Sequence, residues 1–89
     1  MTNLRRQSMF CFPGYRWCGP WCSGPGQPIN QVDACCMYHD QCLRSGFSPC
    51  ACDERFMECL RPMMHGPYPM NRHARIMYSA MRLRRPFVC

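Results

Sequence analysis

The sequence predicts a small, all-α, disulfide-rich fold, with a single domain over residues 1–89. Ten of the 89 residues are cysteines, a density typical of scaffolds in which cross-links replace a large apolar core. Nine prolines and six glycines leave room only for short regular elements. Two pairs of cysteines lie seven residues apart, which is two turns of an α-helix. We therefore expect two antiparallel helices linked by disulfides, with a loop before them and a third helix after them.

Turn-forming residues fill the first third of the chain. Residues 1–32 contain repeated Pro and Gly pairs, which predict a loop. Asn30 or Asp33 can cap the first helix, which runs to about Arg44. Gly46 follows in a position suited to a left-handed helix end.

The second and third helices are bounded in the same way. Ser48 can cap a second helix over residues 49–60, and the Pro that follows it is common in the first turn of a helix. Residues 62–70 form a connector that is rich in Pro and Gly. The third helix is expected over residues 71–85, closed by Pro86. One of its sides carries Ala74, Met77, Tyr78 and Met81, and another carries Arg72, Arg75 and Arg82.

The cysteine spacing predicts how the first two helices face each other. Cys35 and Cys42 lie on the first helix, and Cys52 and Cys59 lie on the second. Since seven residues span roughly 10.5 Å along a helix axis, bonds Cys35–Cys59 and Cys42–Cys52 would join antiparallel helices at two levels. His39 then lies between the two cross-links and faces the second helix.

Two carboxylates are candidates to act with His39. Asp53 lies within about one helical turn of its level, where it can accept a hydrogen bond from one imidazole nitrogen and leave the other free as a base. The alternative is an ordinary carboxylate that the helix dipole stabilises, and both can hold. Asp40 instead faces the preceding loop, and a carboxylate beside loop carbonyls is a ligand set that calcium prefers. A bond from Cys36 to Cys18 would pin that loop against the helix.

A zinc site and a nucleic-acid-binding protein are alternatives. Zinc sites usually show matched pairs of cysteine knuckles, and Cys18-x3-Cys22 with Cys50-x-Cys52 do not form such a pair. The net charge is +6, and all basic residues are Arg, whose forked side chain suits phosphate oxygens on lipid, nucleic acid or a phosphate-rich matrix. A nucleic-acid binder would show strong salt dependence, but no nucleic-acid motif accompanies the charge.

Two stretches of the chain match the motifs of one enzyme family. The first is Trp17–Pro20 with Ser23–Gly26, followed by Asp33–Cys42, which reads Asp-Ala-Cys-Cys-Met-Tyr-His-Asp-Gln-Cys. The second is Ser48–Leu60, with its Cys-x-Cys-Asp segment. Together they resemble the calcium loop, the active-site helix and the second long helix of secreted phospholipase A2, closest to the bee-venom-like type. The match covers about residues 15–60, and the combined motifs are highly specific.

The resemblance implies calcium-dependent hydrolysis of the sn-2 ester of glycerophospholipids, which releases a fatty acid and a lysophospholipid. His39 would activate the water, Asp53 would hold His39, and Tyr78 would support Asp53. Calcium bound by Asp40 and loop carbonyls would polarise the ester and stabilise the oxyanion. The implied carbonyl ligands are those of Trp17, Gly19 and Trp21, with Cys22 as an alternative to Trp21.

The resemblance also implies the disulfide pattern and the surroundings of the protein. In addition to the two bonds between the helices, it implies Cys18–Cys36 and Cys50–Cys89, and it leaves Cys11 with Cys22. Such a chain is expected to be secreted or extracellular, although residues 1–8 lack the apolar run of a secretion signal.

The expected partner is a phospholipid membrane or micelle surface, in anionic form because of the arginines, and no nucleic acid. Contact would come from the Arg-rich third helix and from exposed aromatic residues; packing in a small core is the alternative for the aromatics. These aromatics are Phe10, Phe12, Trp17 and Trp21.

A catalytically weak, phospholipase-like binding or structural protein is the second function considered. The intact His39, Asp40 and Asp53 argue against it, because loss of one of them would be its usual signature. The other two histidines, His65 and His73, show no partner pattern, and we expect both at the surface.

Overall fold

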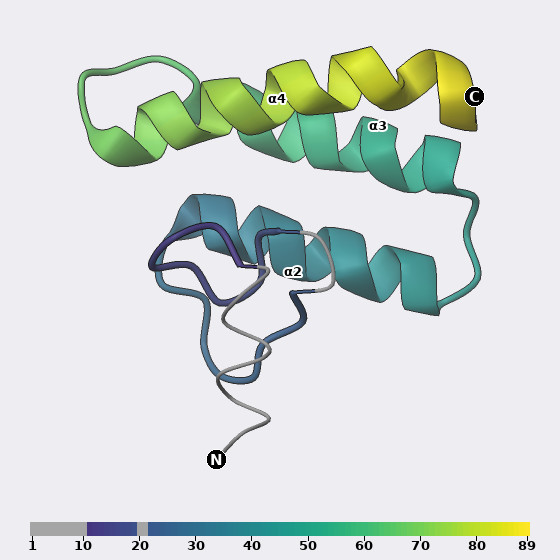
Figure 1. Ribbon diagram of the computed structural model, residues 1–89, viewed down its shortest axis with the longest axis horizontal. Helices are drawn as coiled ribbons and strands as arrows, with labels where there is room; N and C mark the ends of the chain where they lie inside the picture. The colour runs from purple at the N-terminus through teal and green to yellow at the C-terminus, as the bar shows by residue number, and fades with distance from the viewer. Residues whose placement is uncertain (1–10, 20–21) are drawn as a thin grey trace.

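Three α-helices make up most of the computed structural model, which describes residues 11–19 and 22–89 (Figure 1). They are α2 (Gln31–Arg44), α3 (Pro49–Leu60) and α4 (Pro69–Val88), with a short 3-10 helix, η1 (Arg61–Met63), directly after α3. No strand occurs in the described residues. In Figure 1, α3 lies between α2 and α4, and the loop that precedes α2 lies beside it. The predicted all-α fold class is confirmed.

Side-chain caps explain where α2 and α3 begin. The side chain of Asn30 accepts a hydrogen bond from the Asp33 amide, and Ser48 does the same for Ala51, so each satisfies an amide that has no partner within its helix. Asn30 is therefore the cap of α2, and the side chain of Asp33 is free for another role. Gly46 follows α2 with φ +91°, the left-handed conformation that its position predicted.

The bounds of α4 differ from those predicted. The helix starts at Pro69 and continues to Val88, so the expectation that Pro86 closes it is wrong. A proline this close to the end removes only one hydrogen bond near the helix terminus. The amide of Cys89 still donates to Arg85 O at 2.9 Å, and a Cys50–Cys89 disulfide ties the last turn to α3.

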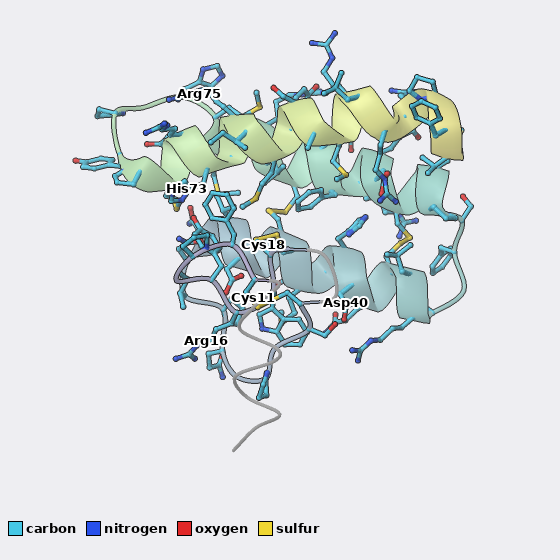
Figure 2. The ribbon with its side chains drawn as sticks, viewed as in Figure 1. Cys11, Arg16, Cys18, Asp40, His73 and Arg75 are labelled. Carbon is cyan, nitrogen blue, oxygen red and sulfur yellow. A yellow bond between two sulfur atoms is a disulfide. The ribbon has the colours of Figure 1, made fainter. Side chains whose placement is uncertain are left out.

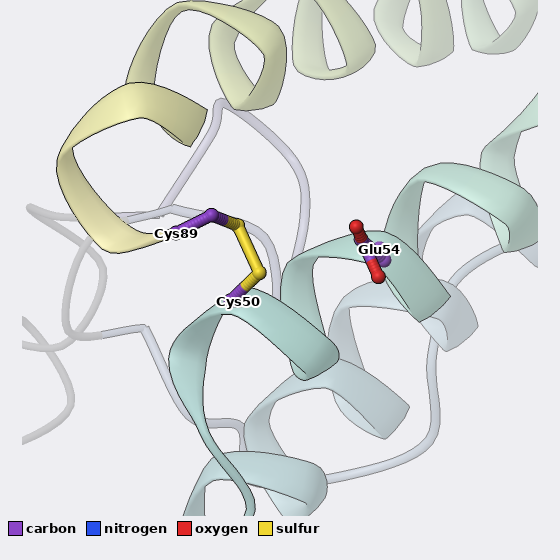
Figure 3. A group of neighbouring side chains, drawn as sticks. All are labelled: Cys50, Glu54 and Cys89. Atoms are coloured by element: carbon purple, nitrogen blue, oxygen red, sulfur yellow. A yellow bond between two sulfur atoms is a disulfide. The ribbon is translucent and has the colours of Figure 1, made fainter.

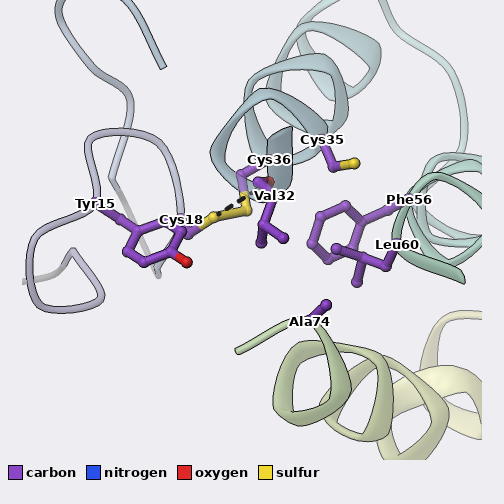
Figure 4. Close-up of a cluster of buried hydrophobic side chains, with 8 residues drawn as sticks. All are labelled: Tyr15, Cys18, Val32, Cys35, Cys36, Phe56, Leu60 and Ala74. Carbon is purple, nitrogen blue, oxygen red and sulfur yellow. Dashed lines mark hydrogen bonds between the residues drawn. A yellow bond between two sulfur atoms is a disulfide. The ribbon is translucent and has the colours of Figure 1, made fainter. Parts of the chain in front are cut away.

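The core gathers side chains from the loop and from all three α-helices (Figure 4). Val32 of α2, Leu60 of α3 and Ala74 of α4 are completely buried. Tyr15 and Cys18 extend this cluster into the loop. Cystine sulfur fills much of the space that large apolar residues would occupy in a larger protein, and small domains commonly rely on such cross-links.

All ten cysteines form disulfides. The two bonds expected between α2 and α3 are present, with Cα–Cα separations of 5.8 and 5.7 Å, and both lie within the range that a disulfide can bridge. The remaining three also have the partners that the resemblance implied. The five pairs are Cys11–Cys22, Cys18–Cys36, Cys35–Cys59, Cys42–Cys52 and Cys50–Cys89.

An aromatic cluster joins the loop to α4. Tyr15 Oη lies 2.8 Å from His73 Nδ1, and Phe12 packs edge-on against the His73 ring. Burial raises the pKa of Tyr15 above its ordinary value of 10.0, so the hydroxyl stays protonated at neutral pH and can donate to His73. The expectation of a surface position is therefore wrong for His73, which is half-buried, whereas His65 is exposed. No helix in the described part of the chain is both long and apolar enough to span a bilayer.

Candidate active site

His39 lies on the face of α2 that packs against α3, between the two disulfides that join these helices. Its Nε2 is 2.7 Å from Asp53 Oδ1, and the His39 side chain is 16% exposed to solvent. Because an ionised carboxylate only accepts hydrogen bonds, this contact assigns the proton to Nε2 and leaves the Nδ1 lone pair free. The ring of Phe56 lies 4.9 Å from that of His39, centroid to centroid, and limits its rotation.

Asp53 has a second partner that the sequence analysis missed. Arg84 of α4 donates from Nε to Asp53 Oδ2 at 2.6 Å and from Nη2 to Oδ1 at 3.4 Å. The hydroxyl of Tyr78 accepts instead from Arg61 at 3.1 Å. The structure therefore does not pair Tyr78 with Asp53, as the resemblance implied, and places a guanidinium there. The sequence offered one indication of this contact. Arg84 lies seven residues after Met77 and three after Met81, so it shares the helix face that carries these methionines.

Asp40 points to the other side of α2, toward the loop, as its position in the helix predicted (Figure 2). Ser23 Oγ donates to Asp40 Oδ1 at 3.2 Å. The second oxygen, Oδ2, is buried and makes no hydrogen bond among the described residues. Arg44 Nε lies 3.1 Å from it, but outside hydrogen-bonding geometry, so the pair is electrostatic only. A buried carboxylate oxygen without a hydrogen bond is an energetic cost unless a cation compensates it.

The loop before α2 is folded around a buried carboxylate. Asp33 is completely inaccessible to solvent, and its two oxygens accept from four backbone amides. Three belong to consecutive loop residues, Arg16, Trp17 and Cys18, at 3.1, 2.8 and 3.2 Å, and the fourth to Ile29 at 3.0 Å. From the sequence, Asp33 was predicted only as a possible helix cap. The sequence offered one indication of this role. Asp33 is the third residue after the Asn30 cap, and a side chain at that position can reach backbone amides before the helix start.

Two of the three loop residues named as calcium ligands lie in the described part of the chain. Trp17 is held through its amide by Asp33 and through its indole, which donates to Gly26 O at 3.0 Å. The carbonyl of Gly19 accepts from the Cys22 amide at 3.1 Å. Trp21 lies outside the described residues. The ligand role of each of these carbonyls stays a prediction, and the loop that carries them is tied to α2 by Cys18–Cys36.

Two hollows among the described residues differ in whether they contain the histidine. A cavity of about 120 Å³ is lined by His39, Tyr38, Arg55 and Phe56, with the cystines that join α2 to α3. That volume holds a few water molecules, and a fatty acyl chain would have to lie outside it. The wider hollow, about 540 Å³, lies between α3 and the end of α4 and includes Arg82 and Arg85. None of His39, Asp40 and Asp53 lines it.

A cluster at the end of α4 has the composition of a metal site but not its chemistry. Cys50, Glu54 and Cys89 bring their ligand atoms within 4.8 Å of one another (Figure 3). The two sulfurs are bonded to each other, whereas thiolates are what bind metals. Glu54 is paired with Arg85 at 2.6 Å. This cluster is a disulfide and an ion pair that join the end of α4 to α3.

Comparison with known proteins agrees with this geometry. A phospholipase A2 from Xylocopa aruana is 34% identical in an alignment 81 residues long that covers 68% of this chain and 45% of the bee protein. Phospholipase A2 homolog 3 from Oryza sativa subsp. japonica is 42% identical over 55 residues, 57% of this chain and 34% of the rice protein. The chain is a relative of the phospholipases A2. The resemblance to the bee-venom-like type is confirmed by the Xylocopa protein.

The likeness to phospholipases A2 covers only part of each relative. Probable phospholipase A2 homolog 1 of the same rice is 37% identical over 57 residues, 63% of this chain and 38% of the rice protein. The chain thus spans less than half the length of these curated phospholipase A2 relatives. No family model and no solved structure matches the chain.

Proposed function

We propose that this protein hydrolyses the sn-2 ester of glycerophospholipids with the help of calcium. The observation that carries the proposal is the arrangement around α2. His39 is paired with a buried carboxylate on one side of the helix. On the other side, Asp40 has a buried oxygen that makes no hydrogen bond among the described residues and has Arg44 as an ion-pair partner. The relatives named phospholipase A2 support the same chemistry.

The His39–Asp53 pair can perform the proton transfers of ester hydrolysis. His39 Nδ1 takes a proton from a water molecule as the water oxygen bonds to the acyl carbon. The Nε2–H bond to Asp53 holds the ring in the reactive tautomer and stabilises the positive charge that the ring gains. When the ester C–O bond breaks, His39 returns the proton to the departing glycerol oxygen, and the fatty acid and the lysophospholipid are released.

Asp40 fits the calcium role better than an ordinary surface carboxylate does. Its buried Oδ2 has no hydrogen bond among the described residues, and Ser23 keeps its Oδ1 beside the loop. Asp40 would hold calcium with loop carbonyls, including those proposed at Trp17, Gly19 and Trp21, since calcium prefers oxygen ligands. The bound ion would supply positive charge to the ester carbonyl oxygen. Arg44 is exposed and can swing away from Asp40.

The proposed partner is an anionic phospholipid surface, met by the outer side of α4. Ile76, Leu83 and Phe87 are exposed by 45, 76 and 86%, and spacings of seven and four put them on one face. The same helix has no acidic residue. It also carries three exposed arginines, Arg72, Arg75 and Arg82. In contrast, Phe12 and Trp17 are half-buried, which supports packing for these aromatics. Five disulfides suit the proposed extracellular location.

Fatty-acid release from phospholipid vesicles, measured with calcium and with a chelator, tests the proposed reaction. We expect release only with calcium. His39→Gln should lower kcat about 100- to 10,000-fold, the usual contribution of a general base. His65→Gln is the matched control, because that histidine is exposed and outside the site. Equal release by His39→Gln and the parent protein would refute the proposal.

A catalytically weak, phospholipase-like binding protein is the second candidate, favoured by the position of Arg44 beside Asp40. A permanent Arg44–Asp40 pair would leave no place for calcium. Thermal unfolding with and without calcium separates the two functions, because an ion that binds the folded state raises Tm. The hydrolase predicts a calcium-dependent rise in Tm that Asp40→Asn abolishes; the binding protein predicts none.

A further inference from the structure

Arg84 is placed where it can control the geometry of the candidate site. It comes from α4, 31 residues after Asp53, and binds a carboxylate on α3 that is only 2% exposed. Its Nε binds Asp53 Oδ2, and its Nη2 lies near Oδ1, the oxygen that also accepts from His39. The Arg84 side chain as a whole remains 43% exposed.

A buried carboxylate next to a neutral histidine needs a further partner. Burying an ionised carboxylate is costly unless a charge and hydrogen bonds compensate it. When His39 is ready to accept a proton, it is neutral and offers Asp53 a single hydrogen bond. Among the described residues, Arg84 supplies the only positive charge in contact with Asp53. Its forked donors bind both oxygens and so oppose rotation of the carboxylate.

We propose that Arg84 is a positioning residue for His39: it holds Asp53 Oδ1 in line with His39 Nε2–H and thereby keeps His39 Nδ1 aimed at the substrate water. This inference rests on the proposed function for its effect on turnover. It assigns to an arginine on α4 the support that the resemblance gave to Tyr78. The last turn of α4 is fixed independently of Arg84, by the Cys50–Cys89 disulfide and the Arg85–Glu54 pair.

The neighbouring arginine provides a matched control. Arg84→Gln and Arg85→Gln each remove one charge and one ion pair from the same helical turn, but only Arg84 contacts Asp53. We expect Arg84→Gln to lower kcat about 10- to 100-fold, as is typical for the partner of an active-site ligand, with little change in KM. Arg85→Gln should keep the kcat of the parent protein. Equal kcat values for the two variants would overturn the inference.

Proton NMR at a single pH provides a readout that does not depend on turnover. The His39 Nε2–H, hydrogen-bonded to a buried carboxylate, should give a low-field signal that is absent in His39→Gln. We expect Arg85→Gln to keep this signal and Arg84→Gln to shift it or lose it by faster exchange. An unchanged signal in Arg84→Gln would refute the positioning role. If the parent protein shows the signal but no hydrolysis, the proposed function fails and the inference about the hydrogen bond stands.

Arg84→Lys serves if Arg84→Gln does not fold. A lysine keeps the charge but offers a point-like ammonium in place of the fork. Because the inference depends on both oxygens of Asp53 being held, Arg84→Lys should have a kcat below that of the parent protein and a displaced His39 Nε2–H signal. A lysine variant identical to the parent in both measurements would show that charge alone is sufficient, against the inference.

Discussion

Two buried aspartates show how the same side chain takes different roles in different surroundings. Asp33 and Asp53 are both shielded from solvent. Asp33 accepts only from backbone amides, so it fixes the shape of the loop. Asp53 accepts from His39 and Arg84, so it fixes the orientation of an imidazole. Neighbours, rather than residue type, decide between a structural and an active-site carboxylate.

The role of Asp33 gives a prediction at the residue scale. In Asp33→Asn, an amide NH2 must face backbone N–H donors in a site closed to solvent, which leaves donors unpaired. We expect a loss of about 2 kcal/mol or more in the free energy of unfolding, measured by urea titration. Glu54→Gln is the control, because its ion pair is exposed and should cost less than about 1 kcal/mol. Equal losses in the two variants would contradict this role for Asp33.

At the scale of elements, the end of α4 depends on a tertiary cross-link. Its sequence contains a proline in the last turns, and local propensity predicts a stop there. The disulfide Cys50–Cys89 and the Arg85–Glu54 pair join this end to α3. Since Arg84 lies in the same turns, the cross-link also keeps its guanidinium close to Asp53.

Removal of that cross-link tests the dependence. The double variant Cys50→Ser, Cys89→Ser should lose about 2–4 kcal/mol of unfolding free energy, the usual contribution of one disulfide. Amide hydrogen exchange should become faster in the last turn of α4, around Phe87, while amides of α2 remain protected. Unchanged exchange at the end of α4 would show that the helix holds its last turns without the disulfide.

Over the whole molecule, exposed charge and apolar surface meet on α4. The chain carries a net charge of +6, and the outer side of α4 combines arginines with exposed Leu83 and Phe87. An anionic lipid surface satisfies both features, because phosphates pair with arginine and the interface accepts apolar side chains. The small cavity at His39 is also consistent with a substrate whose chains stay in the lipid layer.

Vesicle binding tests this surface. Leu83→Ser with Phe87→Ser should weaken binding to vesicles with anionic lipid by about tenfold or more, because two apolar side chains no longer enter the interface. Phe47→Ser is the matched control, since Phe47 is also exposed but belongs to the turn that connects α2 to α3 rather than to α4. Binding should also fall when neutral lipid replaces anionic lipid. Equal binding by parent and double variant, or loss of self-association instead of lipid binding in sedimentation, would contradict the proposal.

The sequence by itself determined α2 and α3, the cap of α3 at Ser48, and the facing of His39 toward Asp53. These features depend on short spacings: capping residues next to helix starts, and cysteines two turns apart, which permit only a few pairings. The resemblance implied two of the remaining disulfide pairs, Cys18–Cys36 and Cys50–Cys89, and so left Cys11 with Cys22.

Only the tertiary structure decided which groups complete the site. Arg84 reaches Asp53 from 31 residues away, Asp33 gathers amides from both ends of the loop, and α4 continues past Pro86 to an end that is bonded to α3. The contacts of Arg84 and Asp33 depend on the cost of burying an unpaired charge, which no local pattern shows. The bounds of α4 depend on how its last turn packs against α3, although the resemblance had implied the Cys50–Cys89 bond. Sequence spacing placed the histidine, and the packing of α4 against α3 chose an arginine rather than Tyr78 as the partner of Asp53.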